Sequence, residues 1–393
     1  MENRRISPAL TLTALAINAF AIGSTEFISV GLMPLIVKSF NISLAQAGLT
    51  VSIYALGITI GAPILTVLTA NWDRRKLMLA IMLIFIIGNL LAATAPTFAI
   101  LLLGRIVAAL AHGIFMSVSS LIAADVVPMD KRASAIAIMF TGLTVATVTG
   151  VPLGTFIGQH LSWHWSFIFI AIVGLIGLIA NFFLIPNNLP HPETRPDLKG
   201  FKRVLTNQPI VLALLITALG YGGTFTSYTY LTPILEKYMH FSANAVVIIL
   251  IVYGLMVAVG NTIGGRLANS NPLSALIRMF IGLAITLGLL FIFINQPVLG
   301  LVAVMLLGLF AFMNVPGLQL YIVQLAEKFT PNDIGLASAL NISAFNIGIT
   351  LGSFIGGEVT ATLSVAMTPI FGVIMVVIAI LLTVRLASVM KTR

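Results

Sequence analysis

Long apolar runs separated by short polar stretches make up almost the whole chain. A membrane-spanning helix needs about 20 consecutive, mostly apolar residues, and runs of about this length recur from one end of the sequence to the other. We therefore predict an all-α integral membrane protein whose twelve helices form two pseudo-symmetric six-helix halves. The predicted spans are residues 9–37, 45–69, 77–95, 98–124, 134–158, 163–185, 209–235, 243–268, 273–294, 298–326, 335–360 and 363–388.

The longest polar segment divides the chain almost in half. We predict an N-terminal six-helix bundle at residues 1–186, a cytoplasmic linker at 187–208 and a C-terminal six-helix bundle at 209–393. Within the linker, Leu198, Phe201 and Leu205 recur at helical spacing beside Lys199 and Lys202. A short amphipathic helix on the inner leaflet and a simple solvated linker both fit this pattern.

The two halves are related by a shift of 199 residues. Without a gap, this shift matches Pro34 with Pro233, Lys38 with Lys237, and Tyr54 with Tyr253. We interpret it as a parallel repeat of six spans, which is an architecture found among transporters. The same shift places Phe225 opposite Glu26, so a carboxylate is present in one half only.

Composition and charge exclude several classes of protein. The 393 residues are 59% hydrophobic and 8% charged, which rules out an ordinary soluble domain and a disordered chain. There is no cysteine, so disulfides and thiolate metal sites are excluded. The net charge of +9 comes from Lys and Arg in alternate loops, as the positive-inside rule requires, and we expect anionic membrane lipid rather than nucleic acid as its partner.

Three titratable residues interrupt the apolar runs of the first half. Glu26 lies in the first span, while Arg105 and His112 lie in the fourth, and such groups at membrane depth are costly unless they serve a function. At 1.5 Å per residue, Glu26 and Arg105 lie about 5 and 9 Å outward of their span centres, and His112 is about 10 Å further inward. All three are therefore candidates for proton coupling. A static Glu26–Arg105 ion pair and a packing role for His112 are the alternatives.

Polar and aromatic side chains elsewhere in the spans predict the lining of a substrate cavity. Each of them, taken alone, is also compatible with a hydrogen bond between helices. The set comprises Asn18, Tyr54, Tyr221, Tyr228, Tyr253, Asn314, Gln319, Asn341 and Asn346.

Two further motifs involve loops and glycines. The loop after the second span carries Asp73, Arg74, Arg75 and Lys76, for which Asp125 at the end of the fourth span is a possible carboxylate partner. One alternative is that the basic residues only set the topology of the chain. The fifth span contains Gly142, Gly150, Pro152, Gly154 and Gly158, a spacing that permits close helix contact with or without a hinge.

Together these motifs resemble the major facilitator superfamily, in particular its twelve-helix drug:proton antiporter branch of bacterial sugar-efflux and chloramphenicol-resistance exporters. The likeness covers essentially the whole chain and includes Thr25-Glu26-Phe27 in the first span. It implies a proton-transfer role for Arg105, a latch role for the basic loop and an antiporter role for the fifth-span glycines. The chain departs from the pattern at Ala70, Asp73 and Val151.

The expected function is export of small organic molecules in exchange for protons, by alternating access. We expect no cofactor beyond the proton gradient, since no GxxxxGK[ST] motif for phosphate is present. The expected partners are a small-molecule substrate, protons and membrane lipid, and the expected form is a monomer in the bacterial cytoplasmic (inner) membrane. A proton-linked importer or facilitator is the alternative; a membrane-embedded enzyme is disfavoured, because HExxH and GxSxG are absent and the five histidines are dispersed.

The distribution of Lys and Arg predicts that both termini and the 187–208 segment are cytoplasmic. Reporter fusions after Lys202 and at Arg393 should therefore show the cytoplasmic signal. A periplasmic signal at either position would contradict this topology.

Overall fold

The computed structural model describes residues 7–69, 72–128, 131–187, 189, 198–268 and 271–391. Twelve helices in these ranges are long and apolar enough to cross a membrane, which confirms the predicted number of spans. The described residues contain no strand, so the all-α fold class is also confirmed.

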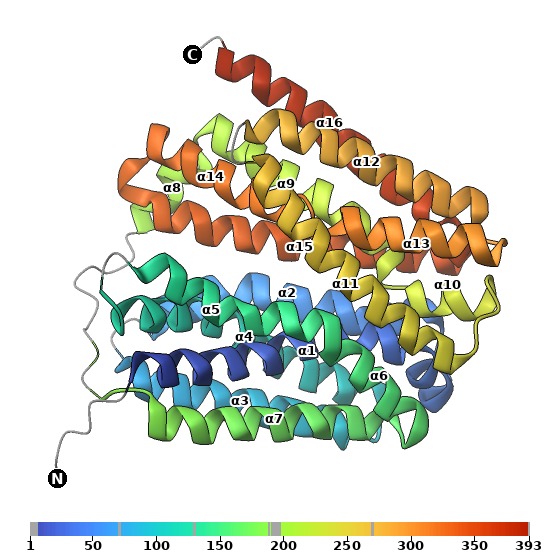
Figure 1. The fold of residues 1–393 in the computed structure, drawn as a ribbon, viewed down its shortest axis with the longest axis horizontal. Helices are drawn as coiled ribbons and strands as arrows, with labels where there is room; N and C mark the ends of the chain where they lie inside the picture. The colour runs from blue at the N-terminus through green and yellow to red at the C-terminus, as the bar shows by residue number, and fades with distance from the viewer. Residues whose placement is uncertain are drawn as a thin grey trace. The chain divides into compact units, whose positions relative to one another are not determined.

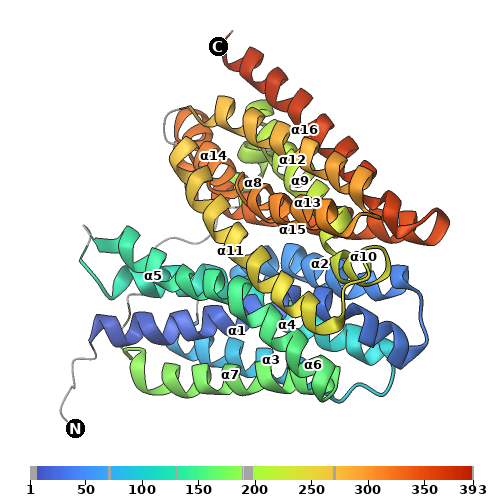
Figure 2. The same cartoon turned by 45° about the vertical axis from the view of Figure 1, so that its right-hand side comes forward.

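Figures 1 and 2 show the helices in chain order from blue to red. The elements of the first half are α1 (Pro8–Phe40), α2 (Leu44–Leu68), α3 (Arg74–Ala93), α4 (Phe98–Asp125), α5 (Arg132–Val145), the π-helical turn η2 (Ala146–Gly150), α6 (Val151–His160) and α7 (Trp163–Leu184). Those that follow are α8 (Leu198–Leu205), α9 (Gln208–Tyr228), α10 (Leu231–Lys237), α11 (Ala243–Ala268), α12 (Pro272–Phe293), α13 (Pro297–Ala311), α14 (Val315–Phe329), η3 (Pro331–Asp333), α15 (Ile334–Thr362), η4 (Val365–Met367) and α16 (Thr368–Lys391).

Contacts between helices group the chain into two compact units. The first comprises Met1–Leu35 and Ile60–Arg195, and the second comprises Ile36–Thr59 and Pro196–Arg393. The first part of α2 thus packs within the second unit, where Thr350 Oγ1 donates a hydrogen bond to the Ser52 carbonyl at 3.3 Å. The predicted division into six-helix bundles at residues 1–186 and 209–393, joined by a linker at 187–208, stays a prediction.

In the first unit, α3 packs against both α4 and α7, and α6 packs against α7. Glycines bring α1 close to the fifth span. A Cβ at Gly142 would meet the backbone of Ala16 and Phe20, one at Gly150 would meet Ser24, and one at Gly154 would meet Ile28. The fifth-span glycines therefore make the close helix contact that their spacing predicted, and the partner helix is α1.

The second unit repeats this packing with α9 in the place of α1. The α9 helix packs against α15 and α16. Along α15, a Cβ at Gly348 would meet the Ala218 carbonyl, and one at Gly352 would meet the Gly222 carbonyl. In each half the first helix of the repeat is thus contacted by a glycine row on the fifth helix of the same repeat.

The repeat also reaches the loops. Asn41 and His240 have φ angles of 51° and 57°, and they are the only non-glycine residues with positive φ in the described ranges. They are separated by 199 residues, which is the shift found in the sequence. Each residue follows a helix of its repeat, so both halves leave that helix through the same left-handed turn.

Three of the predicted spans are irregular. The fifth contains the π-helical turn η2, in which the Val151 amide donates to the Ala146 carbonyl just before Pro152, a residue without an amide hydrogen. The tenth is interrupted between α13 and α14, where Pro316 cannot donate to the helix. The seventh is interrupted between α9 and α10, whereas α1 continues through Pro34, the match of Pro233.

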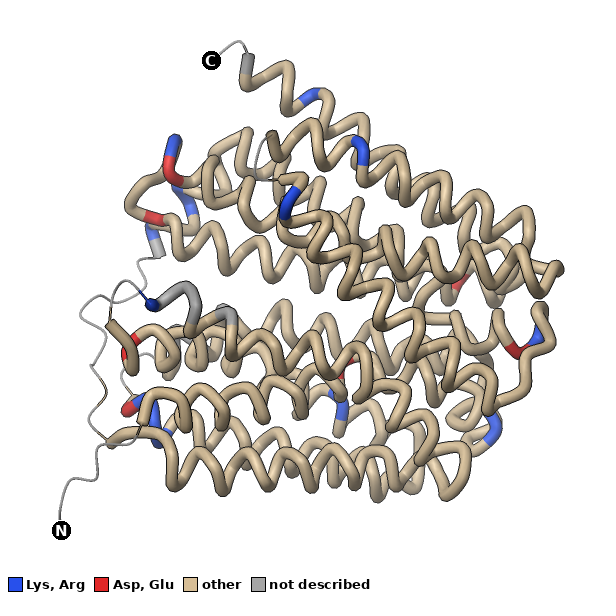
Figure 3. The backbone as a smooth tube through the Cα atoms, in the orientation of Figure 1, with Lys and Arg blue, Asp and Glu red and all other residues tan. Residues whose placement is uncertain are grey.

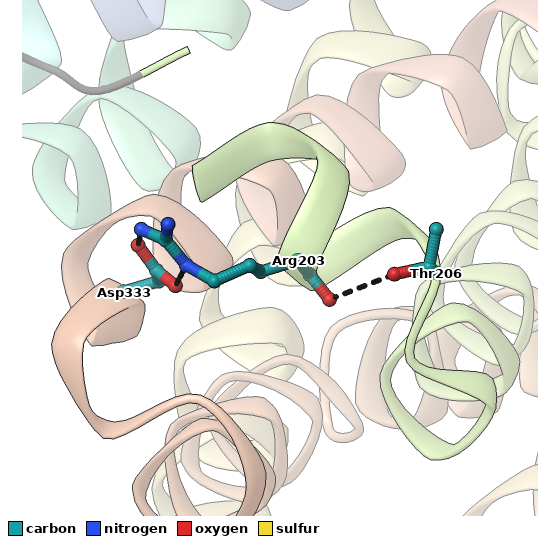
Figure 4. A network of polar contacts seen from close by, with 3 residues as sticks. All are labelled: Arg203, Thr206 and Asp333. Atoms are coloured by element: carbon teal, nitrogen blue, oxygen red, sulfur yellow. Dashed lines mark hydrogen bonds and ion pairs between the residues drawn. The ribbon is translucent and has the colours of Figure 1, made fainter. Parts of the chain in front are cut away.

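The linker contains a helix, α8, which was one of the two alternatives that fitted the amphipathic pattern. Arg203 of α8 makes a bidentate ion pair with Asp333 of η3, with Nε–Oδ2 and Nη2–Oδ1 distances of 2.8 and 2.7 Å (Figure 4). At the end of α8, the hydroxyl of Thr206 donates to the carbonyls of Lys202 and Arg203. The Arg203–Asp333 ion pair ties α8 to the start of α15. Residues 190–197 of the predicted linker lie outside the described residues.

We expect Gly142→Leu to destabilise the protein more than Gly154→Leu. The added side chain at position 142 meets backbone atoms, which cannot move aside, whereas at position 154 it meets the flexible end of Ile28. Overpacking costs about 1–3 kcal/mol or more, so the thermal unfolding temperature in detergent should fall for both variants, and transport should be lost.

Gly288→Leu is the matched control, because no atom lies within 4 Å of a Cβ at that position. Equal unfolding temperatures and equal transport for Gly142→Leu and Gly288→Leu would contradict a packing role for the fifth-span glycines.

Candidate functional site

Charged residues lie mostly near the ends of the helices in each unit (Figure 3). Arg105 is an exception, because it lies within α4 and its side chain is 0% exposed. An arginine cannot lose its charge in such a place and must be satisfied by acceptors. Its surroundings therefore define the candidate site of the first unit.

Arg105 finds these acceptors in the backbone of α1. Its Nη1 donates to the Thr25 carbonyl at 2.6 Å, and its Nη2 donates to the Glu26 carbonyl at 3.1 Å. The planar guanidinium spans two successive carbonyls, which a lysine ammonium cannot do with the same geometry. Arg105 is thus a tie between α4 and α1 at the level of Glu26.

Glu26 lies beside this guanidinium. The Glu26 carboxyl and Arg105 interact electrostatically, and the Glu26 side chain is half-buried. The structure therefore brings together the acid and the base that the helix geometry had predicted to lie at similar depth. Arg105 also donates two hydrogen bonds to backbone oxygens of α1, so its position is tied to the backbone of that helix.

His112 joins the same group. It lies seven residues beyond Arg105 on α4, its side chain is 5% exposed, and it interacts electrostatically with Arg105. The two residues are about two helical turns apart on nearly the same face, as the sequence predicted. Among the described residues, no cluster of three or more His, Asp or Glu side chains has the arrangement of a metal site. The site offers a carboxyl, a guanidinium and an imidazole as its ionisable side chains.

Neighbouring helices hold α1 at this level from several sides. The Thr25 hydroxyl donates to the Ala21 carbonyl at 3.0 Å and reaches Asn89 Oδ1 on α3 at 3.4 Å. Gly150 at the end of the π-helical turn packs on Ser24. The segment that carries Glu26 is consequently fixed by α3, α4 and the fifth span together.

The predicted latch residues make several different contacts at the start of α3. Arg74 at the start of α3 pairs with Asp125 at the end of α4, the carboxylate that the sequence suggested. Asp73 caps α3, its side chain accepting from the Lys76 amide at 2.9 Å. Arg75 donates to the Phe182 carbonyl of α7 and lies over its ring, 5.4 Å from the centroid. The loop thus ties α3 to α4 and α7, while a latch function stays a prediction.

The predicted cavity residues fall into separate groups. Asn18 makes a helix-to-helix bond, its Nδ2 donating to Asn181 Oδ1 of α7 at 2.6 Å. In the second unit, Thr217 donates to Asn341 at 2.7 Å, Asn341 donates to Gln319 at 2.9 Å, and Gln319 donates to Ser338 at 2.7 Å. This chain of hydrogen bonds connects α9, α15 and α14. Polar side chains within a membrane commonly hydrogen-bond to a neighbouring helix in this way.

Three predicted tyrosines, Tyr221, Tyr228 and Tyr253, lie together in the second unit. Tyr228 of α9 stacks on Tyr253 of α11 with a centroid distance of 5.2 Å and an interplanar angle of 11°. Tyr221 contacts Phe225 at 5.1 Å. Tyr54 of α2 is 1% exposed, and Asn314 and Asn346 are also buried. Whether any of these side chains contacts a substrate stays a prediction.

Sequence reasoning missed several partners. Asn89 and Asn181 interrupt apolar runs just as Asn18 does, so the rule that selected Asn18 would also have found them. Phe225, Phe312 and Phe345 join the tyrosines, but phenylalanine is common in every span and carries no such signal.

We expect Arg105→Lys to reduce transport by roughly tenfold or more while leaving membrane insertion intact. A lysine keeps the charge but cannot bond both the Thr25 and Glu26 carbonyls, and a hydrogen bond to a charged group contributes about 1.5–3 kcal/mol. The measurement is uptake or efflux per inserted protein. Arg278→Lys is the control, because Arg278 is exposed and bonds the Ser274 carbonyl of its own helix. Equal activities of the two variants would contradict the role assigned to Arg105.

Comparisons with known proteins agree with this architecture. A family model described as Major Facilitator Superfamily matches residues 15–329. An uncharacterized MFS-type transporter of Bacillus subtilis (strain 168), YtbD, is 53% identical over 381 residues, covering 97% of this chain and 96% of that protein. The inner membrane transport protein YdhP of Escherichia coli (strain K12) is 38% identical and covers 94% of each chain.

Solved structures are similar in fold alone, at low sequence identity. A crystal structure of a D-xylose-proton symporter superposes with a TM-score of 0.77 at 15% identity, over 95% of this chain and 97% of that chain. A bacterial homologue of the human lysosomal transporter Spinster, inward-facing and occupied, has a TM-score of 0.76 at 18% identity, over 97% of each. From the family match, the close relatives and the twelve spans, this chain belongs to the major facilitator superfamily of multi-pass membrane transporters.

Proposed function

We propose that this transporter is a secondary transporter that exports small organic molecules in exchange for protons by alternating access. In this proposal Glu26 binds a proton. The substrate displaces that proton, and this displacement couples the flux of substrate to the flux of protons. Arg105 and His112 act with Glu26 as the coupling group.

A single observation carries the proposal: a half-buried carboxylate lies beside a fully buried guanidinium within the apolar first unit. Buried charges in a membrane are costly, and they are usually retained for ion or proton movement. The second half has Phe225 at the matching position, so the repeat itself does not require an acid there. This asymmetry favours a functional carboxylate over a packing one.

The bonds of Arg105 suggest how the coupling works. Because its guanidinium bonds two α1 carbonyls, the positive charge stays in place whether or not Glu26 carries a proton. A deprotonated Glu26 is then stabilised by this fixed charge, and a protonated Glu26 is released from it. Proton binding thereby changes the interaction between the carboxyl of α1 and the fixed charge on α4, which is the kind of differential interaction that shifts a conformational equilibrium.

Export is favoured over import by two features. The glycine row of the fifth span resembles the antiporter motif, and it packs directly on the helix that carries Glu26. A D-xylose-proton symporter has a similar fold, so a proton-linked importer or a facilitator is the alternative and the fold does not decide between them. The proposal includes no catalytic step. The proton gradient is the transporter's only energy source in it, and no cofactor takes part.

The proposed setting is the bacterial cytoplasmic membrane, with both termini cytoplasmic and the chain acting as a monomer in contact with anionic lipid. The distribution of Lys and Arg along the sequence supports this orientation. Asp73, Arg74, Arg75, Lys76 and Asp125 form the proposed cytoplasmic latch.

Glu26→Gln should abolish uphill export while preserving binding of a neutral substrate. Glutamine keeps the shape and hydrogen bonding of the side chain but cannot ionise, so no proton is exchanged. A deletion strain screened against antibiotics, dyes, sugars and purines first identifies a substrate. Accumulation of that substrate in proteoliposomes under a pH gradient then measures coupling, with a fall of about tenfold or more as the expected result.

Glu327→Gln is the matched control, because Glu327 is an exposed acid near the end of α14. Undiminished uphill accumulation in Glu26→Gln would overturn the proposal and make His112 the next candidate. The direction of movement relative to the pH gradient in the wild-type protein separates exporter from importer.

A further inference from the structure

Six aromatic rings form one continuous cluster in the second unit, here called the ring cluster. Its members are Tyr221, Phe225 and Tyr228 of α9, Tyr253 of α11, Phe312 after α13, and Phe345 of α15. Residues 221, 225 and 228 follow each other at one helical turn, so they lie along one face of α9. Four helical segments that are distant in sequence thus present rings to one another.

One polar group in the ring cluster lacks a partner. Tyr253 is 2% exposed and its hydroxyl makes no hydrogen bond, although it interacts electrostatically with Tyr228 and Tyr221. A buried tyrosine hydroxyl normally finds a hydrogen-bond partner. Outside the cluster, the buried Tyr230 donates its hydroxyl hydrogen to the Ser353 carbonyl at 2.9 Å, and the partly buried Tyr238 bonds Ser364 at 2.8 Å. The unpartnered hydroxyl of Tyr253 marks a place where a polar atom of another molecule would be stabilised.

Phe312 stands apart from the other rings because it lies outside regular helix. It follows the last residue of α13 at the interruption before α14, and its side chain is partly exposed. Its ring stands edge-on to Tyr221 and Tyr228, with centroid distances of 5.5 and 6.5 Å and interplanar angles of 84° and 87°. Such edge-to-face contacts are the geometry that a second aromatic ring favours. Phe312 therefore occupies a position that suits an aromatic ligand.

The six residues of the ring cluster lie in uncharged stretches of the sequence. No Asp, Glu, Lys or Arg lies within two helical turns of any of its six residues along the sequence. A ligand held there gains apolar burial and ring contacts, together with one hydrogen bond. An uncharged aromatic ring with a hydroxyl or amide substituent meets these conditions.

We propose that the ring cluster binds an uncharged aromatic ring of the exported compound, which takes the place of the Phe312 ring and bonds the Tyr253 hydroxyl through a polar substituent. The inference rests on the proposed function, since it names the class of substrate that the transporter carries. It gives the second unit the role of recognition.

Fluorine NMR on the purified full-length transporter in detergent tests the proposal without any gradient. The probes are para-fluorophenol, fluorobenzene and the saturated analogue fluorocyclohexanol. We expect para-fluorophenol to bind more tightly than either of the others, because only it combines a ring with a hydroxyl. Tyr253→Phe should weaken para-fluorophenol about fivefold, as expected for one lost hydrogen bond, and leave fluorobenzene unchanged.

Phe312→Ala separates ligand binding from packing. If the ligand ring replaces that of Phe312, then removing the phenylalanine should strengthen the binding of para-fluorophenol, even where the protein becomes less stable. Tyr238→Phe is the control and should leave every affinity unchanged, because Tyr238 lies outside the ring cluster. The proposal is overturned if the saturated analogue binds as well as the phenol, or if Tyr253→Phe and Phe312→Ala both leave the affinity for the phenol unchanged.

The Glu26→Gln variant distinguishes failure of the ring-cluster proposal from failure of the proposed function. The ring cluster predicts that this variant still binds para-fluorophenol, because Glu26 belongs to the other unit. Coupled export that survives in Glu26→Gln refutes the coupling role alone. Loss of ring binding in wild type with coupled export intact refutes the ring cluster alone.

Discussion

A buried charge in an apolar helix needs partners, and Arg105 obtains them from the backbone of α1. Thr25 and Glu26 supply two carbonyls to one guanidinium that is entirely buried. This interaction sets the register between α1 and α4 and places Glu26 beside a positive charge that cannot be neutralised. Everything proposed about proton binding depends on it, because a carboxylate without this neighbour would be isolated among apolar side chains.

Close packing by glycine makes that register possible. Gly142, Gly150 and Gly154 let the fifth span approach the backbone of α1, and Gly348 and Gly352 let α15 approach α9 in the same way. In lipid there is little hydrophobic drive between helices, so contact area and backbone approach carry much of the association energy. The two halves share this device even though their side chains differ elsewhere. The repeat is therefore conserved in its packing rather than in its chemistry.

The chemistry is divided between the halves. Glu26, Arg105 and His112 lie in the first unit, while the matching position of Glu26 in the second is Phe225, a member of the ring cluster. Ionisable groups suit proton binding, and aromatic rings with hydroxyl groups suit an organic ligand. The two halves therefore share a packing arrangement but carry different functional side chains. Within the second unit, the Arg203–Asp333 ion pair connects the linker helix α8 to η3.

The sequence by itself determined the number of spans, the repeat and the unusual residues. Hydrophobic length predicts helices in a membrane because every backbone group must be bonded within its own segment. The carboxylate, guanidinium and imidazole stand out for the same energetic reason. Helix geometry then predicts a similar depth for Glu26 and Arg105 and a shared helix face for Arg105 and His112. The Arg74–Asp125 pair was also anticipated, because opposite charges at neighbouring helix ends attract one another.

The tertiary structure decided which groups the functional side chains contact. The sequence predicted that Arg105 would lie near the Glu26 side chain. Its guanidinium donates to two backbone carbonyls, which every residue carries and no sequence pattern marks. The same holds for Asn18, whose bond to Asn181 depends on how α1 and α7 face each other, and for Phe312, whose ring joins the tyrosines because α13 ends there. Depth along the membrane follows from counting residues, whereas rotation and facing between helices follow from packing, which depends on side chains far apart in the chain.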